Sequence, residues 1–285
     1  MKRNVLLCSM AVLSFSLIFL GYATETAREV SSSDGVPIRY LVQGGGDPAL
    51  VFVHCWCCDR NYWKNQVPYF VERHKVVTID LAGHGDSGLE REDWTLELFA
   101  ADVSAVIDTL DLDRVILIGH SMGGPVIMEA ARLMPGRVIG IIGVDTFQDF
   151  EREYSDAQKQ QFIVGFTMDF ATTTSGFVKM MFPADADTNL VNEIAEDMSS
   201  APPRVGIGAM KNLLNYKPVE TLKDIEVPIR CINSDMFPTN VESNAAHTES
   251  FDVKYMKRRG HFLMLEDPDT FNELLAETIA ELTSG

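Results

Sequence analysis

The stretch Gly119-His120-Ser121-Met122-Gly123-Gly124 decides how this sequence folds, because it stands between the apolar run 115–118 and a segment with helical periodicity. A serine in a tight strand-to-helix turn has to expose its hydroxyl, and such a turn accepts only small residues two positions to either side. Gly119 and Gly123 occupy those positions. The start of the following helix offers free backbone N–H groups that stabilise negative charge on an oxygen. We therefore expect Ser121 to be a nucleophile at the end of a strand.

Short apolar runs alternate with helical segments along most of the chain. Several of the runs are continuously apolar, which is typical of parallel strands that are covered on both faces. The alternation predicts an α/β fold with a mostly parallel, doubly wound sheet. The expected strands are Ile38–Val42, Ala49–Val53, Lys75–Asp80, Arg114–Gly119, Val138–Val144, Ile229–Asn233 and Asp252–Met256, and the expected helices are Thr95–Leu110, Met122–Met134 and Pro268–Leu282.

Residues 147–222 interrupt this alternation. They contain no convincing strand, and they hold seven of the 16 phenylalanines and five of the 13 methionines. We expect a helical cap inserted between two strands, with the core formed by residues 30–146 and 223–285. A cover over a cleft is the functional interpretation, and a peripheral layer of packed helices is the alternative.

The N-terminal residues 1–23 have the layout of a secretory signal peptide. Lys2 and Arg3 precede a charge-free apolar stretch from Val5 to Leu20, and small residues follow around Gly21. We expect export to the periplasm or the medium after this segment is removed. An uncleaved N-terminal membrane anchor is the alternative, although the apolar stretch is short for a helix that spans a bilayer.

The charge balance excludes one class of partner. The 285 residues include 24 Lys plus Arg and 41 Asp plus Glu, which gives a formal net charge of −17. Nucleic-acid binding needs a basic face that neutralises phosphates, so no nucleic-acid partner is expected. The expected partner is a small-molecule substrate, and the oligomeric state stays open.

Four motifs occur in an order that resembles the α/β-hydrolase fold family, over roughly residues 30–283. They are Phe52-Val53-His54-Cys55-Trp56, Asp80-Leu81-Ala82-Gly83-His84-Gly85-Asp86-Ser87, the turn around Ser121, and Gly260-His261-Phe262. The resemblance implies an α/β-hydrolase sheet with a nucleophile elbow made of Gly119, His120 and Gly123. It implies no cofactor and no metal.

The serine hydroxyl needs a base that accepts its proton, and His261 fits that role best. It follows the last expected strand and precedes the last expected helix, where a loop can reach across the sheet to Ser121. His84 and His120 lie in motifs whose roles in the family are structural. His74 and His247 have no motif support.

The third catalytic residue has two candidates. The family usually carries this acid in a G-x-x-D pattern after the strand that follows the cap, but the segment Ile232-Asn233-Ser234-Asp235-Met236-Phe237-Pro238 departs from that pattern. Asp235 can serve if the loop is shortened. Asp145 stands at the end of the strand before the cap, where some lipases and dehalogenases of this fold carry their acid. We prefer Asp145 slightly, because a strand end needs no loop rearrangement.

The resemblance also implies an oxyanion hole made by the backbone N–H groups of Met122 and Trp56. Cys55 stands where the family usually has a glycine after the motif histidine, so this loop is expected to differ in detail. We expect Cys55, Cys57 and Cys58 to be buried, with a disulfide to Cys231 as the alternative. The cysteine group has no second cluster with which to hold zinc.

The sequence thus predicts a serine hydrolase that cleaves carboxylic esters with an apolar portion, which the Phe- and Met-rich cap would contact. Epoxide hydrolase and haloalkane dehalogenase chemistry is not expected, because those relatives carry aspartate at the position of Ser121. Lactonase, C–C hydrolase and perhydrolase or haloperoxidase-like activity stay open. So does a ligand-binding sensor that keeps the site with little turnover.

Overall fold

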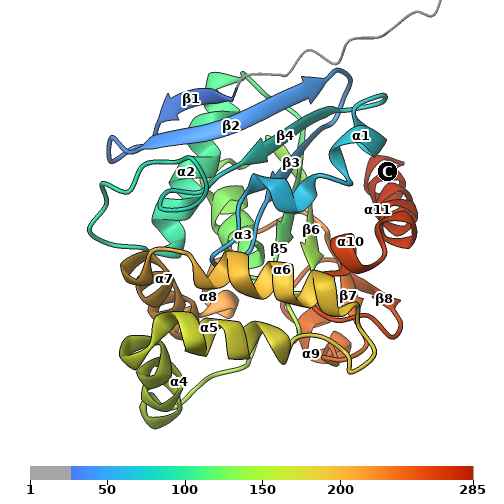
Figure 1. Cartoon of the computed structure of the whole chain (residues 1–285). Helices are drawn as coiled ribbons and strands as arrows, with labels where there is room; N and C mark the ends of the chain where they lie inside the picture. The colour runs from blue at the N-terminus through green and yellow to red at the C-terminus, as the bar shows by residue number, and fades with distance from the viewer. Residues whose placement is uncertain (1–26, 285) are drawn as a thin grey trace, which may run out of the picture.

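A single sheet of eight strands organises the computed structural model, which describes residues 27–284. The expected signal peptide lies outside these residues. Strand β2 runs antiparallel to its neighbours β1 and β4, and all other neighbouring strands are parallel, so the predicted mostly parallel α/β sheet is confirmed. In spatial order the strands are β1 (Arg28–Ser31), β2 (Pro37–Gly44), β4 (Lys75–Ile79), β3 (Ala49–Val53), β5 (Val115–His120), β6 (Val138–Val144), β7 (Ile229–Ser234) and β8 (Phe251–Met256) (Figure 1).

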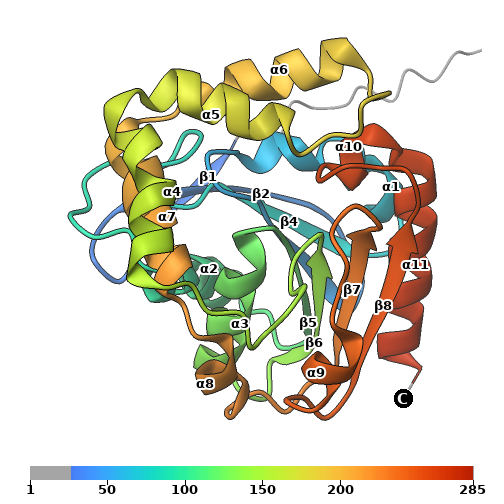
Figure 2. The ribbon, with the colours of Figure 1, turned by 90° about the horizontal axis from the view of Figure 1, so that it is seen from below.

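Helices cover both faces of the sheet, as Figure 2 shows. Helices α2 (Leu96–Thr109) and α3 (Gly123–Leu133) lie on one face, and α1 (Val67–Phe70) and α11 (Pro268–Thr283) lie on the other. Every residue of β3 and β5 is buried, which explains why β3 and residues 115–118 of β5 are continuously apolar. The remaining short helices outside the cap region are η1 (Arg60–Trp63), α9 (Val241–Ala245) and α10 (Leu263–Glu266).

Five helices fill the chain between β6 and β7. They are α4 (Asp156–Met168), α5 (Phe170–Lys179), α6 (Thr188–Ser199), α7 (Pro203–Asn215) and α8 (Pro218–Leu222). The first four gather at one end of the sheet, and we call them the cap, whereas α8 packs against α3 (Figures 1 and 2). The Tyr62 hydroxyl donates a hydrogen bond of 2.6 Å to Asp197 of α6, which ties the cap to the core.

Within residues 27–284, no helix combines the length and the apolar composition that a membrane span requires.

The register of the parallel strands brings their carboxyl ends to one level. Val53 of β3 pairs with Gly119 of β5, Gly119 pairs with Gly143 of β6, and Gly143 pairs with Cys231 of β7. The segments that leave these strands therefore meet at the same edge of the sheet. In doubly wound sheets, ligands bind at this carboxyl edge.

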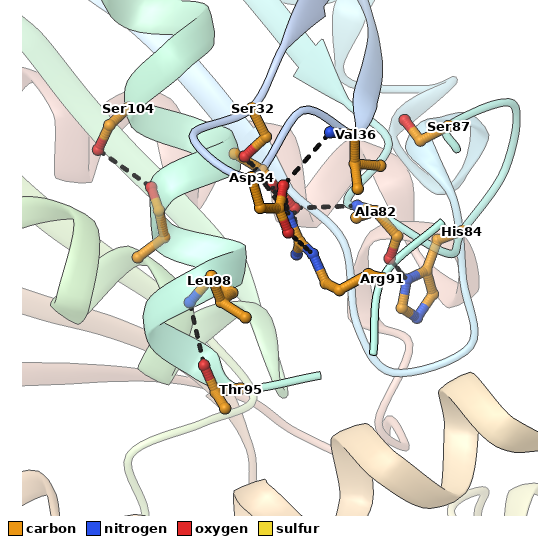
Figure 3. Close-up of polar contacts among 12 residues, drawn as sticks. Ser32, Asp34, Val36, Ala82, His84, Ser87, Arg91, Thr95, Leu98 and Ser104 are labelled. Carbon is orange, nitrogen blue, oxygen red and sulfur yellow. Dashed lines mark hydrogen bonds and ion pairs between the residues drawn. The ribbon is translucent and has the colours of Figure 1, made fainter. Parts of the chain in front are cut away.

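A buried ion pair supports the loop that follows β4. The guanidinium of Arg91 lies 2.6 Å from Asp102 and 2.7 Å from Asp34, and the second carboxylate oxygen of Asp102 accepts the N–H of Ala82 at 3.0 Å. Figure 3 shows Arg91 pointing toward Asp34 and Ser32, with Ala82 and His84 in the adjoining loop. The side chains of Arg91 and Asp102 are 1% and 0% exposed, so each buried charge has its partner.

Candidate active site

The backbone of Ser121 is held in a left-handed conformation, with φ at 54°. Its N–H donates to the carbonyl of Val144 at 3.0 Å, so the turn is fixed to the end of β6. A Cβ on Gly119 would lie 2.3 Å from the carbonyl oxygen of Gly123, and a Cβ on Gly123 would lie 2.6 Å from that of Val53. The chain approaches itself too closely for side chains at these positions. Such a conformation costs a residue like serine about 1–3 kcal/mol, which the surrounding packing has to offset.

His261 and Asp145 form a direct pair. The Nδ1 atom of His261 lies 2.5 Å from Oδ2 of Asp145, and Oδ1 of Asp145 accepts the backbone N–H of Ser234 at 2.8 Å. The Asp145 carboxylate is fully buried, and the His261 side chain is 11% exposed. Both carboxylate oxygens are thus engaged, one by the imidazole and one by the end of β7.

Asp235, the other candidate acid, lies on the surface. Its Oδ1 atom accepts the backbone N–H of Arg258 at 2.9 Å. Among the described residues it makes no hydrogen bond to His261. The structure therefore brings Asp145, and not Asp235, against the histidine.

The backbone of His261 is held at both ends by hydrogen bonds. Its N–H donates to the carbonyl of Met181, in the cap region, at 2.9 Å. Its carbonyl accepts the Nε2–H of His120 at 2.8 Å. Burial holds the pKa of His120 well below its ordinary value, so this ring is neutral and carries the proton that the bond needs. The sequence places His120 in the elbow motif, but it gives no signal for this contact.

The loop after β3 is fixed by His54. The Nδ1–H of this histidine donates to the carbonyl of Cys55 at 2.8 Å, and Nε2 accepts the N–H of Leu81 at 3.0 Å. The left-handed residue in the loop is Cys57, with φ at 57°, and not Cys55, which stands in the usual glycine position. The side chain of Trp56 is anchored by a hydrogen bond of 2.7 Å from its Nε1 to the carbonyl of Gly206.

The expected oxyanion donors lie on the same cavity wall as the serine. Trp56 and Met122 both line the cavity that contains Ser121. In the described part of the chain, neither backbone N–H donates a hydrogen bond to another protein group. Two unpaired N–H groups at the start of a helix and in a neighbouring loop can stabilise an oxyanion.

The four described cysteines are buried free thiols. Cys231 lies in β7, away from the loop cysteines, whereas the Sγ atoms of Cys55 and Cys58 are only 2.8 Å apart. These two residues have C-x-x-C spacing, which is visible in the sequence. Within the described chain, no group of three or more His, Cys, Asp or Glu side chains is arranged to hold a metal ion.

A cavity of about 1050 Å³ joins these groups to the cap. Ser121, His261 and Asp145 line one side of it. No hydrogen bond joins Ser121 Oγ to the His261 ring among the described residues, and in free enzymes such bonds are often long and tighten only when substrate is bound. The cavity is lined by both apolar and charged side chains, and the apolar ones include Phe147, Phe162, Phe177, Met198, Met210, Leu213 and Leu214.

Comparison with known proteins identifies proteins that are similar to this chain. The family model described as "Alpha/beta hydrolase family" matches residues 50–274. A Karrikin insensitive 2 receptor of Petunia hybrida is 24% identical over 257 residues, which are 84% of this chain and 94% of that protein. A non-heme chloroperoxidase of Streptomyces lividans is 38% identical over 112 residues, which are 38% of this chain and 41% of that protein.

Solved structures share the fold over nearly the whole described chain. An esterase from Exiguobacterium antarcticum superposes with a TM-score of 0.80 at 19% identity and covers 90% of this chain and 100% of that one. At this identity the likeness concerns the fold. The residues that do chemistry have to be argued from the site itself.

Proposed function

We propose that this chain, which belongs to the alpha/beta hydrolase family, is a serine hydrolase that cleaves carboxylic esters through an acyl-enzyme formed on Ser121. The observation that carries the proposal is the 2.5 Å contact between His261 and the buried Asp145, on the wall of the cavity that Ser121 also lines. A serine, a carboxylate and a histidine in this chain order and on these elements are the parts that acyl transfer requires.

In the proposed reaction, Ser121 Oγ attacks the acyl carbon while Nε2 of His261 takes the hydroxyl proton. Asp145 keeps the other imidazole proton on Nδ1 and stabilises the ring when it becomes charged. The N–H groups of Met122 and Trp56 stabilise the negative oxygen, and each such donor contributes about 3–4 kcal/mol. His261 then protonates the leaving alcohol. In the second half of the reaction, His261 takes a proton from water, the water oxygen attacks the acyl carbon, and the acid leaves Ser121.

The apolar residues that the cap contributes to the cavity support the proposal that the substrate is an ester with an apolar portion. Phe162, Phe177 and Met198 are among the side chains that face this space, and flexible apolar residues form adaptable pockets. A panel of p-nitrophenyl esters of increasing chain length tests this part. We expect turnover to rise beyond the acetyl ester, and activity that peaks at acetyl with none beyond butyryl would contradict an apolar acyl site.

Labelling with a fluorophosphonate tests the nucleophile directly. We expect one adduct per folded chain, which peptide mapping assigns to Ser121, and none in Ser121→Ala. Ser104→Ala is the matched control, because Ser104 Oγ is bonded to the carbonyl of Ala100 within α2. A folded wild-type chain whose Ser121 stays unlabelled would refute the proposal.

Other functions would use the same residues. A perhydrolase or haloperoxidase-like reaction is suggested by the partial match to the chloroperoxidase, and a slow, receptor-like hydrolase by the match to the Petunia receptor. Lactonase and C–C bond hydrolysis would also use the Ser121 acyl-enzyme. A fluorogenic ester separates a sensor from an ester hydrolase, because a sensor with little turnover releases far less product per chain than a hydrolase that turns over steadily.

We also propose that the protein is exported, on the signal-like composition of residues 1–23. N-terminal sequencing of the protein from separated cell fractions tests this. We expect a new N-terminus near residue 23 in the exported fraction. Full-length protein in the cytoplasm alone would contradict export.

A further inference from the structure

The loop that carries Trp56 also brings two thiols together. The Sγ atoms of Cys55 and Cys58 are 2.8 Å apart, and both residues are almost fully buried, at 1% and 3% exposure. The N–H of Cys58 donates to the carbonyl of Cys55 at 3.2 Å, which closes a tight turn, and the left-handed Cys57 lies inside it. The turn is what places the first and fourth side chains side by side.

This geometry is close to that of a bonded pair. A disulfide has a sulfur–sulfur distance of about 2.05 Å, so the two sulfurs need to approach by less than about 1 Å. The other cysteines are placed differently. The Sγ of Cys57 lies against Gly206 of α7, and Cys231 lies in β7. Cys55 and Cys58 are therefore the pair of cysteines whose sulfur atoms lie close enough to form a disulfide.

One of the two cysteines lies at the cavity wall. Cys55 is among the residues that line the same cavity as Ser121 and Trp56, so this cavity is the route by which a small molecule would approach it. Cys58 is not among the lining residues. The arrangement has one cysteine at the cavity wall and a second sulfur within bonding reach of the first.

We propose that Cys55 and Cys58 form a reversible redox site that a hydroperoxide converts to a disulfide. The Cys55 sulfur attacks the hydroperoxide, the O–O bond breaks, an alcohol or water leaves, and a sulfenic acid forms on Cys55. The Cys58 sulfur then attacks the Cys55 sulfur, the S–O bond breaks, and water leaves with the proton of the Cys58 thiol. Two thiols and one hydroperoxide thus give one disulfide, one alcohol or water, and one further water, with two electrons passing to the peroxide.

The ionisation of Cys58 sets the speed of the second step. Burial raises the pKa of the Cys58 thiol well above its ordinary value, and the neighbouring Cys55 raises it further. Because the thiolate is the reactive form, we expect the closure of the disulfide from the sulfenic acid to be slow at neutral pH and to accelerate as the pH rises.

Oxidation has a consequence for the proposed reaction, and this step rests on the proposed function. Trp56 lies inside the ring that the disulfide closes, and its side chain is held outside that ring by Gly206, Phe166 and Phe177. Because Trp56 lies between the two cysteines in the chain, we expect closure of the disulfide to shift its backbone N–H, which is one of the two proposed oxyanion donors. We expect kcat for a p-nitrophenyl ester to fall about tenfold on oxidation, with KM changed less than about threefold.

Mass spectrometry of the full chain tests the site without using activity. The protein is reduced with dithiothreitol, separated from the reductant, treated with hydrogen peroxide, alkylated and digested. We expect a loss of about 2 Da and a peptide in which Cys55 is linked to Cys58, both reversed by dithiothreitol. A folded chain that gives no such link, or only sulfinic and sulfonic acids, would overturn the proposal.

Single variants sharpen this test. Cys57→Ser and Cys231→Ser are matched controls and should keep the link, whereas Cys58→Ser should accumulate a sulfenic acid on Cys55 that dimedone traps. A link from Cys55 to Cys57 or to Cys231 contradicts the assignment. The wild-type mapping decides the matter even where a variant fails to fold.

The two proposals fail in different ways. If Ser121 is not labelled by the fluorophosphonate, the hydrolase assignment falls and the peptide mapping is unaffected. If Ser121 is labelled and the link forms while kcat stays unchanged, the effect on the oxyanion loop is refuted.

Discussion

The imidazole of His261 and the carboxylate of Asp145 meet at 2.5 Å although 116 residues separate them in the chain. Asp145 is the first residue after β6, and His261 lies in the loop after β8. Because Nδ1–H donates to the carboxylate, Nε2 is left as the acceptor. This is the tautomer that a base for Ser121 requires.

Replacing the two candidate acids separately tests that relationship. Asp145→Asn should lower kcat by about 10⁴, because an amide stabilises the wrong tautomer of the histidine, whereas Asp235→Asn should change it less than about threefold. The measurement is hydrolysis of a p-nitrophenyl ester by folded variants. The reverse ranking would move the assignment to Asp235.

Removing the His120 donor tests how the histidine loop is held. His120→Phe keeps a ring of similar size but leaves the buried carbonyl of His261 without its hydrogen bond. We expect kcat to fall about tenfold with little change in KM, and the free energy of unfolding to fall by about 1–3 kcal/mol. His247→Phe, which removes a surface contact to Glu151, is the control and should leave kcat unchanged. Equal effects of the two variants would argue against a positioning role.

Two glycine substitutions compare a crowded position with an open one. A Cβ at Gly123 would meet the backbone at 2.6 Å, whereas a Cβ at Gly176 in α5 has no neighbour within 4 Å. Urea unfolding should show Gly123→Ala destabilised by about 1–3 kcal/mol. Gly176→Ala should be stabilised by about 0.5–1 kcal/mol, because alanine favours a helix. A Gly123→Ala variant as stable as the wild type would mean that the elbow has room for a side chain at this position.

A buried and an exposed ion pair are expected to differ in how much they contribute to the free energy of unfolding. Arg91→Met leaves the buried Asp102 without its partner and should cost about 3–5 kcal/mol of unfolding free energy. Arg114→Met breaks the exposed pair with Asp47 and should cost less than about 1 kcal/mol. Denaturant titrations measure both values, and similar losses in the two variants would contradict the role of burial.

The buried ring of His84 makes one contribution to the pH dependence of stability. Burial lowers the pKa of His84 to about 3 from an ordinary value of 6.5. Between these values the unfolded chain holds a proton on this ring and the folded chain does not, so stability falls as the pH drops from about 6.5 toward 3.

The variant His84→Gln isolates this contribution. Between pH 6 and pH 4, its unfolding free energy should lose about 1.4 kcal/mol per pH unit less than that of the wild type. Above about pH 7 the two curves should run parallel, because the ring is neutral in both states. Identical slopes at acid pH would show that His84 is protonated in the folded protein.

Most of the sheet was predictable because its strands are buried on both faces. Ala49–Val53 and Val138–Val144 match β3 and β6 to the residue. Strand β1 was missed, since Arg28–Ser31 is a mostly exposed edge strand with little apolar patterning. The cap was predicted as helical, but its separate helices were not, because its apolar residues both pack the helices and line the cavity.

The candidate site could be proposed from the sequence only where one motif carries a residue. Ser121 and His261 are marked by their neighbours in the chain. The choice between Asp145 and Asp235 depends on where the loop holding His261 lies in space, and sequence spacing does not reveal that. The contact from His120 to the His261 carbonyl is hidden for the same reason, since 141 residues separate the two.

The bond from His261 N–H to the Met181 carbonyl limits how this protein can be re-engineered. The chain segment that contains the cap begins after Asp145 and ends before β7, so it looks like a module that can be exchanged for that of another hydrolase. A transplanted cap, however, has to supply a carbonyl at the place of Met181, or the histidine loop loses one of its two backbone supports. Successful chimeras should therefore retain the residues around Met181 and vary those of α4 and α7, which line the cavity.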